Sequence, residues 1–199
     1  MEYTPSYRDD LYLAHHGIKG QRWGVRRYQN PDGSLTPRGK KRYAKSIGYI
    51  DYAKQVTKDA RDALNEDYAL AQNNYIATRD IKKKLIDSGA HTNETFNKMY
   101  PNWDIGTNYD KRRAKFMRDK INQIDVLNKK INDIDVTAQS YRKTKKLVDD
   151  LFAKSTVKMD KINNEYDNSH EVKEYQDMLN RMRKVSRKQT QEIVNKYRL

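Results

Sequence analysis

Two interleaved series of mostly apolar residues, each with a period of seven, run through the second half of the chain and constrain its fold more than any other feature. Positions 117, 124, 131, 138, 145, 152, 159 and 166 are Met, Ile, Ile, Ala, Lys, Phe, Met and Tyr. Positions 120, 127, 134, 141, 148, 155 and 162 are Lys, Leu, Ile, Tyr, Val, Ser and Ile. This spacing is typical of a coiled-coil seam. It predicts one helix from about residue 110 to residue 167, about 85 Å long at the usual rise per residue.

A coiled-coil seam needs a partner helix, and the seam therefore predicts a homo-oligomer. The side chains expected to carry the contact are Ile124, Leu127, Ile131, Ile134, Tyr141, Val148, Phe152, Met159 and Ile162. The alternative is that the long helices of one chain fold back on one another as an antiparallel bundle. The sequence alone does not choose between the two.

The rest of the chain after residue 36 also has helical patterning. Apolar residues recur at three- and four-residue intervals from Pro37 to Ser88, with Thr36 as a capping residue before them and Gly89 as a stop after them. Residues 89–109 hold Pro101, Trp103 and Gly106 and indicate a break, with a short helix around residues 94–100. A second break is expected at residues 167–169, followed by a last helix.

Composition supports an elongated shape. The chain of 199 residues is 36% hydrophobic and 34% charged, which is too polar for a large spherical core. Disorder is the competing interpretation, because low hydrophobicity and a net charge of +14 are its signature, but the periodicity argues against it. We predict an all-α protein, an elongated long-helix bundle or coiled coil with an irregular glycine-rich N-terminal segment. Its expected parts are residues 1–36, 37–109 and 110–199.

Residues 1–36, which we call the recognition segment, differ from the helical remainder. Of the 8 glycines in the chain, 5 lie between Gly17 and Gly39. From Lys19 to Lys45 there are 9 Lys or Arg and a single acid, Asp32. Asn30, Pro31, Asp32 and Gly33 form a turn signature, in which proline sets φ and glycine accepts a positive φ.

The recognition segment interleaves cations with aromatic rings, which suits either protein docking or nucleic acid. Trp, Tyr and Arg dominate protein interface hot spots, and glycines let a backbone lie flat against a partner. The same residues neutralise phosphates and stack on bases. No folded nucleic-acid-binding motif accompanies them, so we place docking first. The predicted docking residues are His15, His16, Gly17, Gly20, Arg22, Trp23, Gly24, Arg26, Arg27 and Tyr28.

No pattern in the sequence supports a catalytic, metal or cofactor site. The absence of cysteine excludes thiolate chemistry and disulfides. His15 and His16 are adjacent and point in opposite directions in an extended segment, which is poor metal-ligand spacing. The glycines at 17, 20 and 24 lack the Lys-Ser or Lys-Thr of a phosphate-binding loop. Carboxylate pairs such as Asp149 and Asp150 are expected on a solvated helix face. We predict a protein that is not an enzyme.

Residues 15–37 read HHGIKGQRWGVRRYQNPDGSLTP. This stretch resembles a short motif of the form HHGIxGxKWGVRR…NxDGSLT, with Arg22 where lysine is common. The motif recurs in proteins of tailed phages and prophages of low-GC Gram-positive bacteria, attached to dissimilar partners that include head-morphogenesis and other virion-associated proteins. Attachment to unrelated bodies implies an address, a docking handle or a processing signal rather than an active centre.

The resemblance implies a phage structural or assembly protein, of scaffolding type, whose partners are other phage structural proteins. Two alternatives stay open: a basic protein packaged with phage DNA, and an effector that binds a host defence protein. No segment approaches the length needed to span a bilayer, which is about 20 apolar residues, and the N-terminus lacks a signal-peptide pattern. We therefore expect no membrane partner, and location in the virion or the host cytoplasm.

Overall fold

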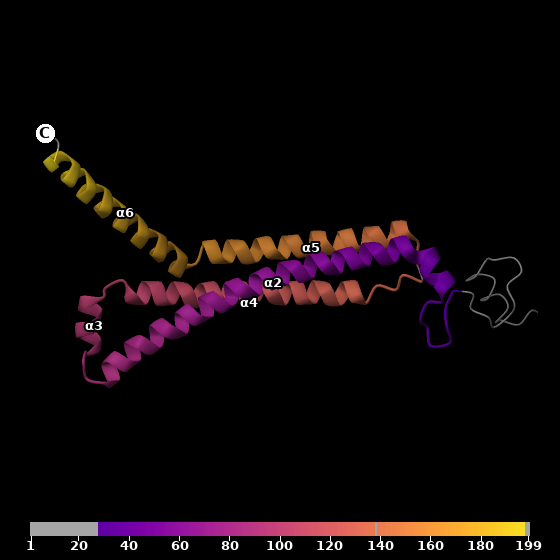
Figure 1. Ribbon diagram of the computed structural model, residues 1–199, viewed down its shortest axis with the longest axis horizontal. Helices are drawn as coiled ribbons and strands as arrows, with labels where there is room; N and C mark the ends of the chain where they lie inside the picture. Colours follow the sequence, from indigo (N-terminus) through magenta and orange to yellow (C-terminus); the bar gives the residue numbers. More distant parts are fainter. Residues whose placement is uncertain (1–27, 138, 198–199) are drawn as a thin grey trace, which may run out of the picture.

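The chain is an elongated bundle of long helices (Figure 1), as described by a computed structural model for residues 28–137 and 139–197. Within these residues there are five helices and no strand. The all-α, long-helix prediction is confirmed. The helices are α2 (Pro37–Asp87), α3 (Asn93–Met99), α4 (Trp103–Asn132), α5 (Tyr141–Asp167) and α6 (His170–Tyr197).

Helix α2 begins and ends where its flanking residues predict. The Thr36 side chain accepts a hydrogen bond from the Gly39 amide at 3.1 Å, and proline occupies the start of the helix, where its missing amide costs nothing. At the other end Gly89 has a φ of +73°, the left-handed conformation that terminates helices. The 51 residues between give a helix about 76 Å long.

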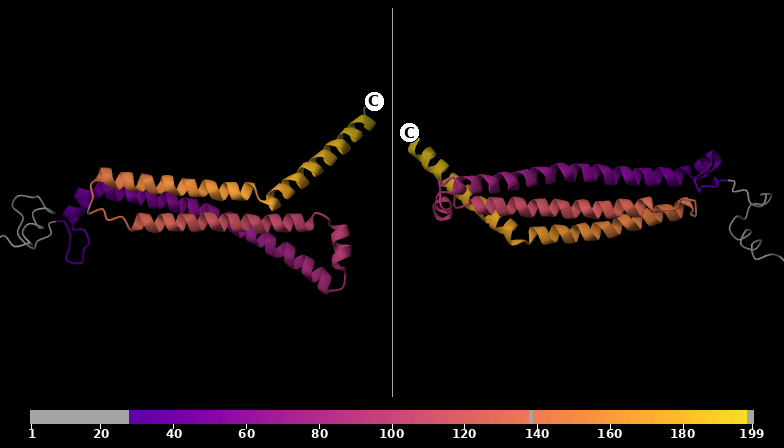
Figure 2. Two further views of the ribbon diagram at one scale, coloured as in Figure 1. Left: turned by 180° about the vertical axis from the view of Figure 1, so that it is seen from behind. Right: turned by 90° about the horizontal axis from the view of Figure 1, so that it is seen from below.

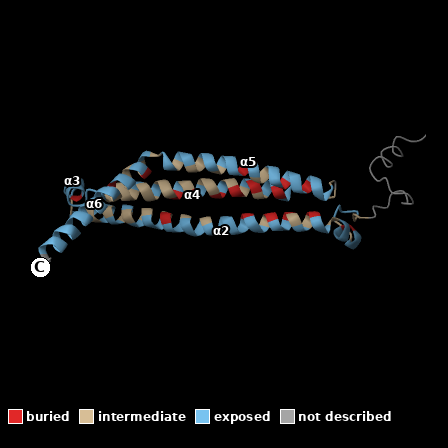
Figure 3. Ribbon diagram, turned by 90° about the horizontal axis from the view of Figure 1, so that it is seen from above, coloured by how far each residue is buried: buried red, intermediate tan, exposed pale blue. Residues whose placement is uncertain are grey.

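Helices α2, α4 and α5 lie side by side, with α4 antiparallel to the other two, and the short α3 closes the corner between α2 and α4 (Figures 1 and 2). Their common core contains Ile50, Ala53, Leu127, Ile131 and Val148. Figure 3 shows that buried residues form thin lines on the inner faces, whereas the outer faces are exposed. A thin, extended core is what the low hydrophobic content predicts.

Polar contacts link the three helices. The Thr57 hydroxyl on α2 donates to Asn128 Oδ1 on α4 at 2.8 Å, and Arg61 Nε lies 2.9 Å from Asp125 Oδ1. Between α2 and α5, the Tyr49 hydroxyl donates to Asp149, which also accepts from Lys145. These bonds are directional, so they add a preferred register to apolar contacts that alone would permit sliding.

The expected single helix over residues 110–167 is wrong. It is interrupted between Asn132 and Tyr141, and α5 turns back along α4. The physical reason lies in the local sequence: Asp135 Oδ1 accepts from the Thr137 amide at 2.7 Å and from the Thr137 hydroxyl at 2.6 Å, a local turn that competes with helix hydrogen bonding. Ile134 and Val136 pack against the core from this turn. Ile134 thereby continues the seven-residue pattern through the break although it is not helical.

The predicted seam therefore folds back on itself within one chain. Ile124, Leu127, Ile131 and Val148 are buried in the bundle, and Ile134 and Phe152 are half-buried against the core. Met159 and Ile162 are also half-buried, whereas Tyr141 is 42% exposed. The apolar surface expected to recruit a second subunit is thus largely used inside the chain, which is the antiparallel alternative that the pattern left open.

The predicted break at residues 167–169 and the short helix near residues 94–100 are confirmed, because α5 ends at Asp167, α6 begins at His170 and α3 spans Asn93–Met99. The start of α6 packs on α4, where the Tyr175 ring stacks on the Tyr109 ring with centroids 4.0 Å apart. The remainder of α6 projects away from the bundle (Figures 1 and 2). Among the described helices, none is long and apolar enough to cross a bilayer.

Candidate functional site

The last part of the recognition segment, residues 28–36, forms a small hairpin that leads into α2. Gln29 and Leu35 make an antiparallel bridge, and the Asn30 amide donates to the Ser34 carbonyl at 2.7 Å. The Gly33 amide donates to the Asn30 carbonyl at 3.0 Å, and Gly33 has a φ of +85°. The turn predicted at residues 30–33 is confirmed.

The acid of this turn is fixed inside the hairpin. Asp32 Oδ1 accepts from the Ser34 hydroxyl at 2.7 Å and from the Ser34 amide at 2.9 Å. These two donors hold the pKa of Asp32 below its ordinary value. The single carboxylate among residues 19–45 therefore stabilises the turn and stays ionised at neutral pH.

The hairpin lies directly against the first turn of α2, and this approach requires glycine. A Cβ at Gly39 would lie 2.1 Å from the Tyr28 carbonyl oxygen and 3.2 Å from Leu35 Cδ2. The Thr36 amide donates to the same Tyr28 carbonyl at 3.1 Å. The backbone of Tyr28 is thus seated on the helix where no side chain intervenes.

A second attachment joins the hairpin to the turn between α4 and α5. Gln29 Nε2 donates to Thr137 Oγ1 at 2.8 Å, and the Thr137 hydroxyl donates in turn to Asp135. Residues at the two ends of this chain of bonds are separated by the whole of α2, α3 and α4. The recognition segment therefore enters the helical body at a defined place, where α2 begins and α5 begins (Figure 1).

Aromatic rings and a cation reinforce this attachment. The Arg42 guanidinium lies 4.6 Å from the centroid of the Tyr28 ring and 5.8 Å from that of the Tyr43 ring. The two rings meet edge to face at 6.5 Å. Such cation–π contacts contribute roughly 0.5–1 kcal/mol at exposed sites. Tyr28, the last of the predicted docking residues, thus contacts the bundle itself.

A surface pocket of about 390 Å³ opens beside this attachment. Its cations are Arg42 and Lys45, its aromatic residues are Tyr43 and Tyr141, and no acid lines it. Hydroxyl and amide side chains from Ser46, Thr137, Gln139 and Ser140 complete the lining. A pocket of this composition suits an anionic or polar group of a partner.

The other nine predicted docking residues, His15, His16, Gly17, Gly20, Arg22, Trp23, Gly24, Arg26 and Arg27, lie outside the described residues. The sequence does not predict that Gln29, Gly39, Arg42 and Thr137 meet at this end of the molecule. Only Gly39 carried a signal, because glycine inside a helix costs about 1 kcal/mol relative to alanine and commonly marks a close approach.

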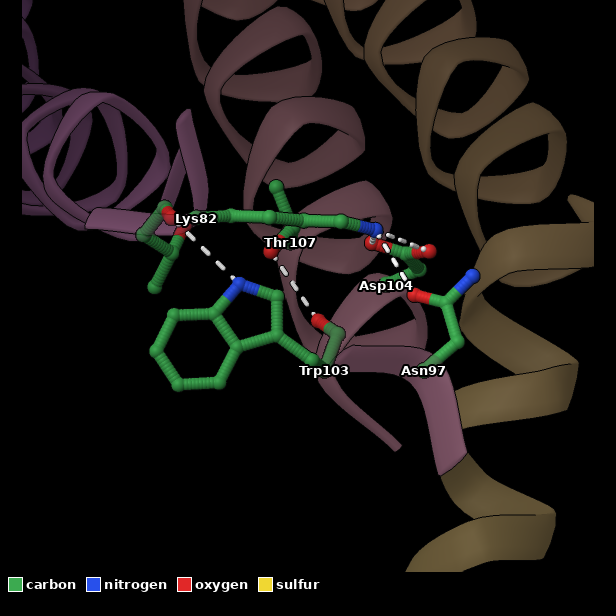
Figure 4. A network of polar contacts seen from close by, with 6 residues as sticks. Lys82, Asn97, Trp103, Asp104 and Thr107 are labelled. Carbon is green, nitrogen blue, oxygen red and sulfur yellow. Dashed lines mark hydrogen bonds and ion pairs between the residues drawn. The ribbon is translucent and has the colours of Figure 1, made fainter. Parts of the chain in front are cut away.

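The opposite end of the bundle holds a polar network that serves the fold. Lys82 Nζ donates to Asn97 Oδ1 at 2.9 Å and to both Asp104 oxygens at 2.7 and 2.8 Å (Figure 4). The Trp103 indole donates to the Thr78 carbonyl at 3.3 Å. The Phe96 ring is fully buried between these groups and packs edge to face on Trp103. Asp104 neutralises the charge of Lys82. The network joins α2 to α4 and stabilises the corner between them.

The described residues offer no cluster of metal-binding type. Within residues 28–137 and 139–197, no three His, Cys, Asp or Glu side chains are grouped so as to hold a metal ion. The carboxylate of Asp149 is engaged by Lys145 and Tyr49, and these donors lower its pKa. Its role is to clamp α5 to α2.

Comparison with known proteins gives one match. The model of a family described as being of unknown function (DUF7211) matches residues 5–30. No curated protein and no solved structure matches the chain. The matched residues include all of the predicted docking residues and end inside the hairpin, at Asn30.

Proposed function

We propose that this chain is a non-enzymatic structural or assembly protein of a tailed-phage virion, which holds its recognition segment at one end of a helical rod. The resemblance of residues 15–37 to a motif attached to dissimilar virion-associated proteins supports this reading. In the proposal, the recognition segment docks on another virion component and the helices set the distance to a second contact.

The observation that carries the proposal is the attachment of the hairpin to the bundle. Residues 28–36 are held by the Gln29–Thr137 hydrogen bond, by the close approach of Tyr28 to Gly39 and by the Arg42 stack. A fixed exit supports a role in positioning a partner relative to the rod.

We place the assembly contacts at the two ends of the rod rather than along its length. The predicted seam residues pack largely within the chain, and a coiled coil between subunits would have to displace α2 or α5 from α4. The proposal therefore does not depend on a homo-oligomer formed through Ile124, Leu127 or Ile131.

The test is incorporation into phage particles. Trp23→Ala combined with Arg26→Ala removes the aromatic and charged anchors expected to dominate an interface. We expect the double variant to be absent from procapsids and virions at unchanged helicity by circular dichroism. A matched control is Lys40→Ala combined with Lys41→Ala, two exposed cations of the adjoining helix turn. Incorporation of the Trp23 and Arg26 variant at the wild-type level would contradict the proposal.

Nucleic-acid binding is the second candidate, favoured by the grouping of Arg42, Lys45, Tyr28 and Tyr43 at the same end. Cations beside aromatic rings are the elements of a single-strand binding surface. Binding of this kind weakens steeply as salt rises, because counterions are released from the phosphates. Titration of DNA oligonucleotides at increasing salt tests it, and salt-insensitive or absent association rules it out.

A further inference from the structure

The start of α6 is integrated into the bundle. Val172 is 3% exposed and Met178 7% exposed, and the Tyr175 ring is stacked on Tyr109 of α4. These contacts fix the direction in which the rest of the helix leaves the bundle (Figure 1). The helix therefore points away from the body from a firm base.

The projecting half of α6, residues 181–196, is exposed along its whole length. It still carries large apolar side chains: Met182 is 54% exposed, Val185 56% and Ile193 58%. An isolated helix of this length is marginal in water, because most helical stability in proteins comes from packing of an apolar face. The projecting half thus lacks the packing that would make it stable.

A groove of about 490 Å³ runs along its base, in the angle between α6 and the bundle. Met178, Met182 and Val185 supply its apolar floor, and Asn102 closes it from the start of α4. The spacing of these α6 residues places them on one helix face, which continues through Gln189 to Ile193. An exposed apolar face of this kind is what a second amphipathic helix packs against.

The charge beside this face is strongly positive. Residues 181–196 contain six Lys or Arg and a single acid, Glu192, which lies 3.8 Å from Lys188 Nζ. By helical spacing, Arg181, Lys184 and Lys188 follow one edge of the apolar face. Complementary charge steers association and penalises like-charged partners, so this surface suits a partner that carries acidic residues along its edge.

We propose that the projecting half of α6 docks an amphipathic, acid-flanked helix of a partner protein, which lies in the groove against Met178, Met182 and Val185. A second copy of α6 would bring a second set of six cations to the same surface. A bilayer would require Trp, Phe or Leu where this face has Gln189 and Ser186. Nucleic acid would use the cations and leave the apolar floor uncovered. The proposal goes beyond the recognition segment, because it concerns the other end of the rod.

The experiment uses the full chain and a synthetic helical peptide with leucines on one face and glutamates on both flanks. The peptide has the same length as residues 181–196. A peptide with lysines in place of the glutamates is its partner control. Binding is followed by fluorescence anisotropy, and amide hydrogen exchange locates it. We expect the acidic peptide to bind and to slow exchange within residues 181–196, whereas the lysine peptide does neither.

Two paired variants separate apolar from charge recognition. Met182→Ser with Val185→Ser leaves the charge unchanged and alters only exposed side chains, and it should weaken the acidic peptide about tenfold or more. Arg181→Glu with Lys184→Glu should transfer preference to the lysine peptide. The matched control, Lys143→Glu with Lys146→Glu, reverses two exposed cations of α5 at the same spacing and should leave peptide binding within about twofold.

Four results would overturn the proposal. Equal binding of both peptides, or unchanged exchange within residues 181–196, would show that no helix docks there. Protection by duplex DNA that survives the Met182 and Val185 substitutions would assign the surface to nucleic acid. Protection by phosphatidylglycerol vesicles in place of the acidic peptide would assign it to a membrane. None of these measurements changes Trp23 or Arg26. A failure of the α6 proposal is therefore distinguishable from a failure of the function proposed for the recognition segment.

Discussion

Gln29 and Thr137 are hydrogen-bonded at 2.8 Å although α2, α3 and α4 separate them in the chain. The Thr137 hydroxyl accepts from Gln29 and donates to Asp135, so one side chain joins the hairpin to the turn that reverses α4 into α5. Two features that the sequence analysis treated separately, the recognition segment and the break in the seven-residue pattern, thus form one structural unit.

Replacement of Thr137 by valine should release the hairpin with little effect on the bundle. The change removes both bonds of the hydroxyl while keeping the side-chain shape, and a typical hydrogen bond contributes about 0.5–1.5 kcal/mol. We expect faster amide exchange at Asn30 and Gly33, and a small decrease in Tm. Thr156→Val is the control, because that hydroxyl donates to the Phe152 carbonyl of its own helix. Equal exchange at Asn30 in both variants would contradict the attachment.

The two helical glycines near the start of α2 should respond in opposite directions to alanine. At Gly39 the new Cβ would meet the Tyr28 carbonyl at 2.1 Å, so the hairpin must move, at a cost of about 1–3 kcal/mol. At Gly48, apart from its chain neighbours and the nearby backbone of α2, no atom of the described residues lies within 4 Å of the new Cβ. Alanine there should stabilise the helix by about 0.5–1 kcal/mol. Denaturant unfolding measures both changes. A stabilised Gly39→Ala protein would show that the hairpin is not seated on α2.

The seam residues should stabilise a single chain. Ile131 is fully buried, and Ile131→Ala should cost about 2–5 kcal/mol, whereas Val126→Ala, at a side chain 44% exposed, should cost far less. Because the core is formed within one chain, the Tm of the wild-type protein should be independent of protein concentration. A Tm that rises with protein concentration would indicate association between subunits and would contradict a core formed within one chain.

Acid should weaken the clamp between α2 and α5. Lys145 and Tyr49 donate to Asp149 and hold its folded-state pKa below the ordinary value of about 4. Its contribution to stability is therefore present above that ordinary value and is lost as pH falls through the lowered one. Wild-type stability should fall more steeply below about pH 4 than that of Asp149→Asn. Parallel pH profiles of the two proteins would contradict the clamp.

Most of the secondary structure could be predicted from the sequence, because the signals are local. Thr36, Pro37 and Gly89 carry the cap and stop signals of α2, and Gly33 carries the positive φ of the turn. The reversal between α4 and α5 could not be predicted in the same way. Ile134 pairs with the core from a non-helical turn, so the seven-residue pattern continues through residues that are not helical.

The candidate site was predictable only in part for a similar reason. The contact between Gln29 and Thr137 depends on the antiparallel packing that brings the α4–α5 turn beside the start of α2. Likewise, the sequence predicts a last helix, but the exposure of that helix beyond Met178 follows from where the bundle ends. Contacts between residues distant in the chain can be predicted only when the tertiary fold is known, whereas caps and turns can be predicted from neighbouring residues.

The central claim is that the chain is a component of phage particles that acts through its recognition segment. Mass spectrometry of gradient-purified procapsids and virions, prepared from cells that encode and express the chain, tests it most directly. We predict peptides from the hairpin and from α6, at a fixed ratio to a head protein, in at least one of the two particles. Their absence from both, with the chain abundant in the lysate of infected cells, would contradict the account.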